Sequence, residues 1–340
     1  MLRHLAVTAL VICTAMCGCE KKDTTASATQ PAAGGAGGGG RRKVVIGFVA
    51  KSQSNQVFQA AHAGARDAAR ELGSKYNADV SVDIRTPTDE DPVKQAEAIE
   101  ALARQGVDGI AVSCSEANTL TGAIDKAVAR GIPVMCFDSD APASKRFAYY
   151  GTDDMTCGKS VMQELARAMN DTGTIAILAG NQSAPNLQAR VAGVRDELRN
   201  HPNIKELNNG AGVFYHQETP EKAAEAVATA QNANPQISGW AMVGGWPLFT
   251  ADALKWPPGS VKVVSVDALP AQLNYLKSGH VEVLLAQDCY GWGSRSVEIL
   301  LEKIIHNKQP ESVRVIDPLT RVTKQNADEY ARKWDKWLGR

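Results

Sequence analysis

Charged, amide and aromatic side chains follow a series of short apolar runs in this sequence, at the positions where parallel strands would end. The candidate residues are Lys51, Asn55, Phe58, Asp138, Arg190, Trp246, Asp267 and Gln287. In open α/β sheets, ligands bind outside the carboxyl ends of the strands. We therefore expect these side chains to meet at one ligand-binding site.

The chemistry of this set suits a neutral polyol such as a sugar. A hydroxyl group both donates and accepts, so carboxylates can accept a hydrogen bond from its O–H while cationic and amide groups donate to its oxygen. The rings of Phe58 and Trp246 could pack against the C–H face of a sugar. The simpler alternative for a strand-end aspartate is a helix N-cap, which applies to Asp138 and more strongly to Asp153 and Asp154.

Signatures of catalysis are absent from the sequence, which contains no GxSxG, HExxH or GxxxxGK[ST] pattern. Beyond the N-terminal region, the histidines are expected on helices or in loops away from the predicted site: His62, His201, His216, His280 and His306. Lys+Arg and Asp+Glu both number 37, so no net charge favours a nucleic-acid partner. We expect neither an enzyme nor a cofactor or metal site.

Four cysteines fall in the body of the chain: Cys114, Cys136, Cys157 and Cys289. Their spacing matches no CxxC metal or redox motif. Buried, unpaired thiols are the simpler interpretation. A disulfide between Cys114 and Cys136 stays open as the alternative, because an exported protein meets an oxidising compartment.

The N-terminal region is typical of an exported lipoprotein. A short basic start precedes the apolar run 5–16, which is too short to span a bilayer permanently. Met16-Cys17-Gly18-Cys19 resembles a bacterial lipobox, so we predict a signal peptide over 1–19 and acylation of Cys19. Residues 20–42 are rich in Gly, Ala, Ser and Thr and predict a flexible tether. An ordinary secretory signal is the alternative.

Apolar runs and amphipathic stretches alternate through the rest of the chain. The first block predicts strands over 44–50, 79–85, 109–113 and 132–137, with helices over 58–72, 93–105 and 119–130. The second predicts strands over 174–179, near 213, and over 240–243, 261–266 and 281–286, with helices over 186–200 and 220–232, from near 248, and over 270–278 and 290–306. Gly73 is expected to cap the first helix. A last helix over 326–338 should bury Tyr330, Trp334 and Trp337 in a core.

This alternation predicts the α/β class, with two Rossmann-like, doubly wound lobes. Successive βαβ units require parallel strands joined by right-handed crossovers. Each block carries enough strands and helices for a complete lobe of this kind. The predicted ligand site then lies between the two sheets, because both blocks contribute strand-end residues to it.

From Lys43 to Gln325 the chain resembles periplasmic sugar-binding proteins of the ribose/galactose class, which serve ABC transporters. The stretches that carry the resemblance are Ile46-Gly47-Phe48-Val49, Gly131-Ile132-Pro133-Val134, Gly151-Thr152-Asp153, Ala189-Arg190-Val191-Ala192-Gly193 and Val264-Ser265-Val266-Asp267. The resemblance implies sugar contacts from Asn55, Asp138, Arg190, Asp267 and Gln287, with Phe58 stacked on the ring.

Four positions depart from the pattern of the ribose binders, among them Val57, which replaces an aromatic residue. Ser139 stands in place of a second arginine, and Gly244 in place of an asparagine. Lys51 stands where the ribose binders have a small polar residue. A lysine at this position is more similar to the sequences of relatives that bind autoinducer-2 or deoxy sugars. Ribose itself is therefore disfavoured, while the polyol class is retained.

The resemblance also implies three hinge strands and discontinuous lobes. The first lobe would comprise 43–152 plus 288–318, and the second 153–287 plus 319–340. The implied protein is a monomer in the periplasm or cell envelope, held to membrane lipid through Cys19, that delivers its ligand to an ABC transporter permease. A sensory receptor working with a membrane kinase is the alternative, whereas a LacI-type regulator lacks its helix-turn-helix here.

Overall fold

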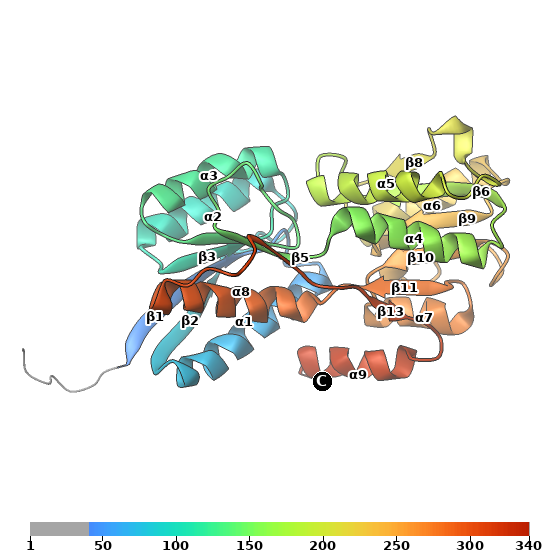
Figure 1. Ribbon diagram of the computed structural model, residues 1–340. Helices are drawn as coiled ribbons and strands as arrows, with labels where there is room; N and C mark the ends of the chain where they lie inside the picture. The colour runs from blue at the N-terminus through green and yellow to red at the C-terminus, as the bar shows by residue number, and fades with distance from the viewer. Residues whose placement is uncertain (1–40, 340) are drawn as a thin grey trace, which may run out of the picture. The chain divides into compact units, whose positions relative to one another are not determined.

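The computed structural model describes residues 41–339, in which helices and strands alternate along most of the chain (Figure 1). The predicted signal peptide, the acylation site Cys19 and residues 20–40 of the predicted tether lie outside the described residues. Strand β1 begins at Arg42, two residues before the predicted start, so the predicted tether ends earlier than expected.

The first sheet is entirely parallel and has six strands in the order β12-β5-β4-β3-β1-β2. Its strands are β1 (Arg42–Val49), β2 (Ala78–Ile84), β3 (Gly109–Val112), β4 (Val134–Phe137), β5 (Ala148–Gly151) and β12 (Arg314–Ile316). Helices α1 (Gln56–Lys75) and α8 (Cys289–His306) cover one face, and α2 (Pro92–Gln105) and α3 (Ala117–Ala129) cover the other (Figure 1). The first block therefore forms a doubly wound unit.

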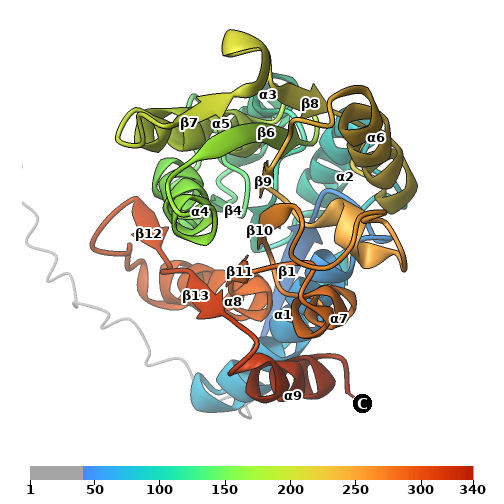
Figure 2. The same cartoon turned by 90° about the vertical axis from the view of Figure 1, so that its right-hand side faces the viewer.

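The second sheet follows the order β13-β11-β10-β9-β6-β7, and β8 pairs with β6. Its strands are β6 (Gly173–Ala179), β7 (Ile204–Glu206), β8 (Val213–Tyr215), β9 (Gly239–Met242), β10 (Lys262–Val266), β11 (Val283–Ala286) and β13 (Thr320–Val322). Only β13 runs antiparallel to its neighbour among the described strands. Helices α4 (Asp154–Ala168) and α5 (Pro185–Leu198) cover one face, with α6 (Pro220–Ala233) and α7 (Pro270–Ser278) on the other (Figure 2).

The chain passes between the two sheets at three places: from β5 to α4, from β11 to α8, and from β12 to β13. The predicted fold class, two doubly wound α/β lobes joined by three connecting segments, is thereby confirmed. The lobe limits given above stay a prediction.

Several predicted elements differ from the structure. The expected helix from near Leu248 is wrong: this segment forms only the short 3₁₀ helix η2 (Trp246–Phe249). Two consecutive prolines, Pro257 and Pro258, and then Gly259 follow soon after, and such residues do not sustain a helix. Gly73 is not a cap either, because α1 continues to Lys75 and the Tyr76 amide still bonds to the Leu72 carbonyl.

The C-terminal helix α9 (Ala327–Trp337) matches the predicted helix closely. Tyr330 and Trp334 are buried, and the indole N–H of Trp334 donates to the Ala268 carbonyl at 2.8 Å. Trp337 is half-buried and stacks on Tyr290, with ring centroids 5.8 Å apart. Two of the three aromatic residues therefore belong to the core, and the third covers its edge.

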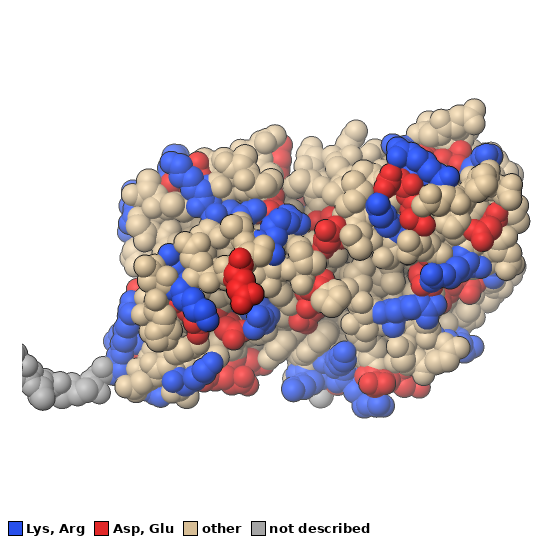
Figure 3. Space-filling view, viewed as in Figure 1, with Lys and Arg blue, Asp and Glu red and all other residues tan. Residues whose placement is uncertain are grey.

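All four body cysteines are buried and unpaired, as the simpler interpretation predicted. The sulfur atoms of Cys114 and Cys136 lie 3.9 Å apart, so the alternative disulfide is not formed here. No helix within residues 41–339 has the length and apolar character needed to cross a membrane. Basic and acidic side chains are interspersed on the face shown in Figure 3.

Candidate functional site

All eight predicted site residues line one small cavity between the carboxyl edges of the two sheets. Lys51, Asn55, Phe58 and Asp138 come from the first sheet and its helix α1; Arg190, Trp246, Asp267 and Gln287 come from α5, η2 and the ends of β10 and β11. This inner cavity measures about 30 Å³, roughly the volume of one water molecule. A molecule with a six-atom ring therefore does not fit into this space in the structure.

Arg190 is fixed in the cavity wall by three hydrogen bonds and is only 2% exposed. Its Nε donates to Asp154 Oδ1 at 2.9 Å, Nη1 to the Val243 carbonyl at 3.1 Å, and Nη2 to Gln287 Oε1 at 2.7 Å. Burial alone would lower the pKa of Arg190, but the carboxylates around it raise the pKa overall. The guanidinium therefore remains a charged donor with two N–H groups still unused.

The helix-cap interpretation holds for Asp153 and is wrong for Asp154. Asp153 accepts a hydrogen bond from the Thr156 amide at 2.8 Å and caps α4. Asp154 is the first helical residue, and its carboxylate turns to Arg190 instead. Burial raises the pKa of Asp154 to about 6, although the charge of Arg190 opposes the shift.

Gln287 connects charged residues of the site to one of the connecting segments. Its Nε2 donates to Asp267 Oδ1 at 2.8 Å, while its Oε1 accepts from Arg190 and from the Thr152 hydroxyl at 3.1 Å. Every one of these atoms is buried. The amide orientation is therefore set by its partners, and Thr152 is a supporting residue that the sequence patterns did not reveal.

Asp138 and Asp267 share an unusual backbone conformation directly after their strands. Their φ angles are 56° and 68°, in the left-handed region that few non-glycine residues adopt. Asp138 Oδ2 accepts from the Ser113 hydroxyl at 2.7 Å, and no helix begins at Asp138, so the cap interpretation is wrong for it. Burial raises the pKa of both aspartates. Residues held in such conformations cluster at ligand sites.

Lys51 is a buried cation whose charged end has no direct partner. It is 3% exposed, yet among residues 41–339 its ammonium makes no hydrogen bond and has no carboxylate within 4.0 Å. Burial alone would lower the pKa of Lys51, but the negative charges of Glu218, Glu90 and Asp138 raise it. Its three N–H donors are available to a ligand.

The remaining predicted residues supply an amide and two rings. Asn55 caps α1 by accepting from the Val57 amide at 3.1 Å, which leaves its NH₂ group free. Phe58 packs against Trp292 with ring centroids 5.9 Å apart. The Trp246 ring lies on the backbone of Gly244, where a Cβ atom would come within 2.2 Å of it. This contact explains why Gly244 replaces the larger residue of the ribose binders.

Further polar residues that the sequence patterns did not predict line the cleft, among them Glu90, His216 and Glu218. Glu90 and Glu218 follow β2 and β8, and His216, expected away from the site, lies beside Glu218 and contacts the Trp246 ring at 5.1 Å between centroids. These residues line an outer cavity of about 710 Å³. Burial, together with the charge of Glu218, raises the pKa of Glu90 to about 7.

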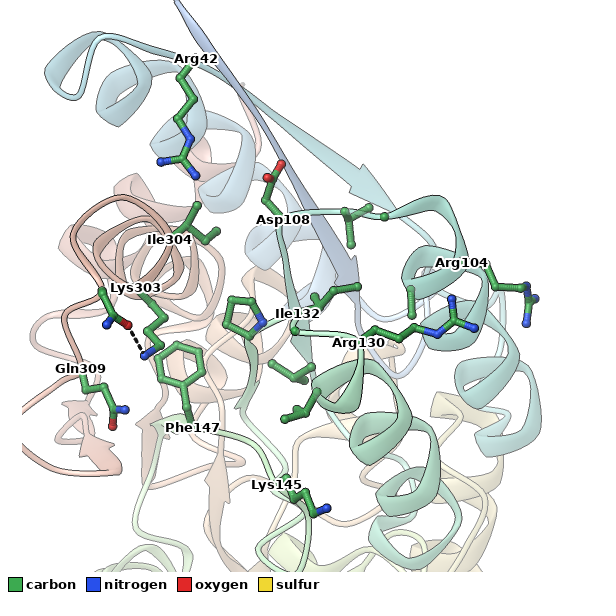
Figure 4. A pocket seen from close by; sticks show the side chains of 18 residues that line it. Arg42, Arg104, Asp108, Arg130, Ile132, Lys145, Phe147, Lys303, Ile304 and Gln309 are labelled. Atoms are coloured by element: carbon green, nitrogen blue, oxygen red, sulfur yellow. Dashed lines mark hydrogen bonds between the residues drawn. The ribbon is translucent and has the colours of Figure 1, made fainter. Parts of the chain in front are cut away.

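A second large cavity, of about 860 Å³, lies at the opposite edge of the first sheet, near the amino ends of its strands (Figure 4). Its lining includes Arg42, Arg130, Lys145 and Lys303, with Asp108 among them. It contains none of the predicted residues, so it is distinct from the cleft. Within the described part of the chain, no group of His, Cys, Asp and Glu is arranged to hold a metal ion.

Comparisons with known proteins agree with the geometry of the site, since the proteins to which the chain is similar bind small molecules. Residues 46–308 match the family described as "Periplasmic binding protein domain". The chain is 28% identical to a xylitol-binding protein of Mycolicibacterium smegmatis over 54% of its own length and 53% of that protein. It is 22% identical to a xylose/arabinose-binding protein of Sulfolobus acidocaldarius over 72% and 62% of the two chains. The chain thus spans only about half to two thirds of these curated relatives.

The solved structures include an ABC transporter solute-binding protein from Burkholderia graminis in complex with D-arabinose. It superposes with a TM-score of 0.76 at 27% identity, covering 85% of this chain and 98% of the other. A glucose-galactose binding protein from Geobacillus stearothermophilus superposes with a TM-score of 0.75 at 23% identity, covering 84% and 99% of the two chains. At this level of identity, the second comparison shows only that the two proteins have the same fold.

Proposed function

Because the chain belongs to the periplasmic binding protein family, we propose that it captures a neutral sugar or related polyol between its two lobes for an ABC importer. The observation that carries this proposal is the placement of Asp138 from the first sheet opposite Arg190 and Asp267 from the second, in the lining of one cavity. The family consists of solute-binding proteins, and a binding role needs no catalytic group.

The unused hydrogen-bonding capacity of the cleft fits hydroxyl groups. Two N–H groups of Arg190 and all three of Lys51 can donate to hydroxyl oxygens, whereas Asp138 and Asp267 each keep acceptor positions. All four residues are buried. A ligand without hydroxyls at these positions would leave charged groups desolvated and unpaired, which is strongly unfavourable.

Binding requires the lobes to separate and close. We take the lobes as 43–152 plus 288–318 and 153–287 plus 319–340, a division supported by the sheets in which these strands lie. A ligand that contacts both lobes favours the closed arrangement by its differential affinity for the two states. The three connecting segments would act as the hinge, and Thr152 and Gln287 lie within two of them.

The proposed function also includes delivery of the ligand to a membrane permease and a preference for ligands of a certain size. A predicted signal peptide and acylated Cys19 would hold the protein at the membrane, beside an ABC transporter permease. The named relatives bind xylitol, or xylose and arabinose, and the Burkholderia protein holds D-arabinose. Five-carbon sugars and polyols are therefore the first ligands to test.

A thermal-shift screen tests the proposal. The panel contains D-xylose, both arabinose enantiomers, xylitol, D-arabitol, D-ribose, D-glucose and D-galactose, with succinate as a charged control. A ligand at 100 times its Kd should stabilise the protein by about 2.7 kcal/mol, which raises Tm by several degrees. If every sugar and polyol leaves Tm unchanged, the proposal is wrong.

A further inference from the structure

The outer cavity continues directly from the inner one and is much larger. The two cavities share Lys51, Asn55, Phe58 and Glu218 in their walls. At about 710 Å³ the outer cavity falls in the range of roughly 300–1,000 Å³ that is typical of ligand sites. Residues from both sheets line it, among them Glu90 from the first and His216 from the second. The cleft therefore has two compartments.

Polar atoms in the outer compartment lack partners. Glu90 Oε1 and His216 Nε2 are enclosed and make no hydrogen bond of good geometry to a described residue, although the side chains of Asn181 and Ser115 lie close to the Glu90 carboxyl group. Nδ1 of His216 lies 2.6 Å from the Gln217 carbonyl, which can only accept, so Nδ1 carries the proton and Nε2 is an acceptor. The unpartnered ammonium of Lys51 adds a donor at the junction of the compartments. Unpaired buried polar atoms are rare, because each loses its hydration without compensation.

The walls of the outer compartment also offer ring surfaces. Tyr215 lines it and remains 36% exposed, so its ring is accessible to a ligand. Phe58 is shared by both compartments. Aromatic faces pack against the C–H face of a sugar ring. Hydroxyl partners and ring surfaces thus occur together in a second place in the cleft.

We propose that the outer compartment is a second sugar subsite, so that the cleft takes a neutral ligand with two sugar rings, such as a disaccharide or a glycoside. This inference rests on the proposed function and specifies its ligand class. Asp89, Glu90 and Glu218 line the outer compartment, and Lys51 is the only cation in its lining among the described residues. This surplus of carboxylates disfavours ligands that carry phosphate or carboxylate groups.

Calorimetric titration with matched probes tests the second subsite. The pairs are D-xylose with xylobiose, L-arabinose with arabinobiose, and D-glucose with cellobiose. In at least one pair the two-ring probe should bind ten times more tightly than the single ring. Glu90→Leu and His216→Phe should each lower the two-ring affinity at least five times more than the single-ring affinity, and Glu90→Gln should restore part of the loss.

Glu221→Gln is the matched control, because Glu221 is exposed, lies three residues after Glu218 and lines neither cavity. It should leave both affinities unchanged. If single rings bind as tightly as two rings in every pair, or if the advantage survives in both His216→Phe and Glu90→Leu, the second subsite is refuted while the proposed function stands. If no probe of either length binds, the proposed function fails and the subsite with it.

Discussion

Gln287 links two charged residues of the site, Arg190 and Asp267, through its side-chain amide. It accepts from Arg190 at 2.7 Å and donates to Asp267 at 2.8 Å, so both charged side chains take their orientation from one amide. Asp267 directly follows strand β10, whereas Arg190 lies within helix α5, and the two share no direct hydrogen bond among the described contacts. The Gln287 amide thus fixes the positions of these two charged side chains relative to each other.

Replacing Gln287 by leucine should therefore damage binding and stability together. Gln287→Leu leaves buried charged and hydroxyl groups without a partner, which typically destabilises a protein by about 1–3 kcal/mol. We expect at least a tenfold weaker affinity for the best sugar of the screen, measured by calorimetry, and a lower midpoint in urea. Gln236→Leu, at an exposed turn position, should change neither. Wild-type affinity in Gln287→Leu would show that the amide does not organise the site.

Glu90 makes a separate prediction about pH. Its pKa rises from 4.5 to about 7 in the folded protein, so the folded state holds this proton more tightly than the unfolded chain does. The stability that the proton contributes is present below pH 4.5 and is lost as pH rises through about 7. Glutamine cannot ionise and avoids this loss.

We therefore expect the Tm of Glu90→Gln, relative to wild type and without ligand, to rise between pH 5 and about pH 7 and to level off by pH 8. Differential scanning fluorimetry at four pH values measures this difference. The exposed Glu221→Gln supplies the control and should track the wild type at every pH. A Tm difference that is the same at pH 5 and pH 8 would mean that Glu90 titrates normally.

At the residue scale, the strand-end rule predicted eight side chains of the inner cavity, but it missed Glu218, which both cavities share, and much of the outer cavity. Strand β8 has three residues and could be placed only near Val213, so its following residues, His216 and Glu218, were not identified. Asp154 was misassigned because Asp153 and Asp154 are chemically identical and only the helix start decides which one caps.

At the scale of elements, Arg190 depends on how closely α4 and α5 approach. Gly158 of α4 faces the backbone of α5, where a Cβ atom would lie 1.9 Å from the Arg190 carbonyl oxygen. No flexible side-chain end can relieve this contact, since the obstacle is backbone. The position of the guanidinium is therefore coupled to the absence of a side chain on the neighbouring helix.

Gly158→Ala should push α5 away from α4 and displace Arg190. Overpacking of this kind costs about 1–3 kcal/mol, and sugar affinity should fall with it. Gly122→Ala is the control, because Gly122 lies in α3 and a Cβ there meets nothing within 4 Å. That change should stabilise the protein by about 0.5–1 kcal/mol through helix propensity. Equal stability of both variants, measured by urea unfolding, would rule out the packing account.

The elements that sequence patterns missed are short or lie between the two blocks. β7, β12 and β13 have three residues each, too few for a periodic signal, and the four-residue strand β5 lies between the two predicted blocks. Helix α4 was not predicted as an element, although Asp153 was correctly given as a cap candidate. By contrast, Pro270–Ser278 was predicted at its full length, because a proline begins it and Gly279 follows its end.

At the scale of the whole molecule, the alternation of strands and helices determined the fold class, because βαβ units admit a parallel sheet with right-handed crossovers. The connection from β12 to β13 between the two sheets was implied only by the family resemblance. Ligand binding between two lobes requires that one molecule contact both of them, at Asp138 after a strand of the first sheet and at Arg190 on a helix that covers the second.

Calorimetric titration of the best sugar into wild type, Asp138→Ala and Arg190→Ala tests this claim most directly, because each variant removes a contact from a different lobe. We predict a micromolar or tighter Kd for the wild type, about −8 kcal/mol or more favourable, and no detectable binding in either variant. Circular dichroism confirms that each variant is folded. Wild-type affinity in both folded variants would contradict a ligand held between the two lobes.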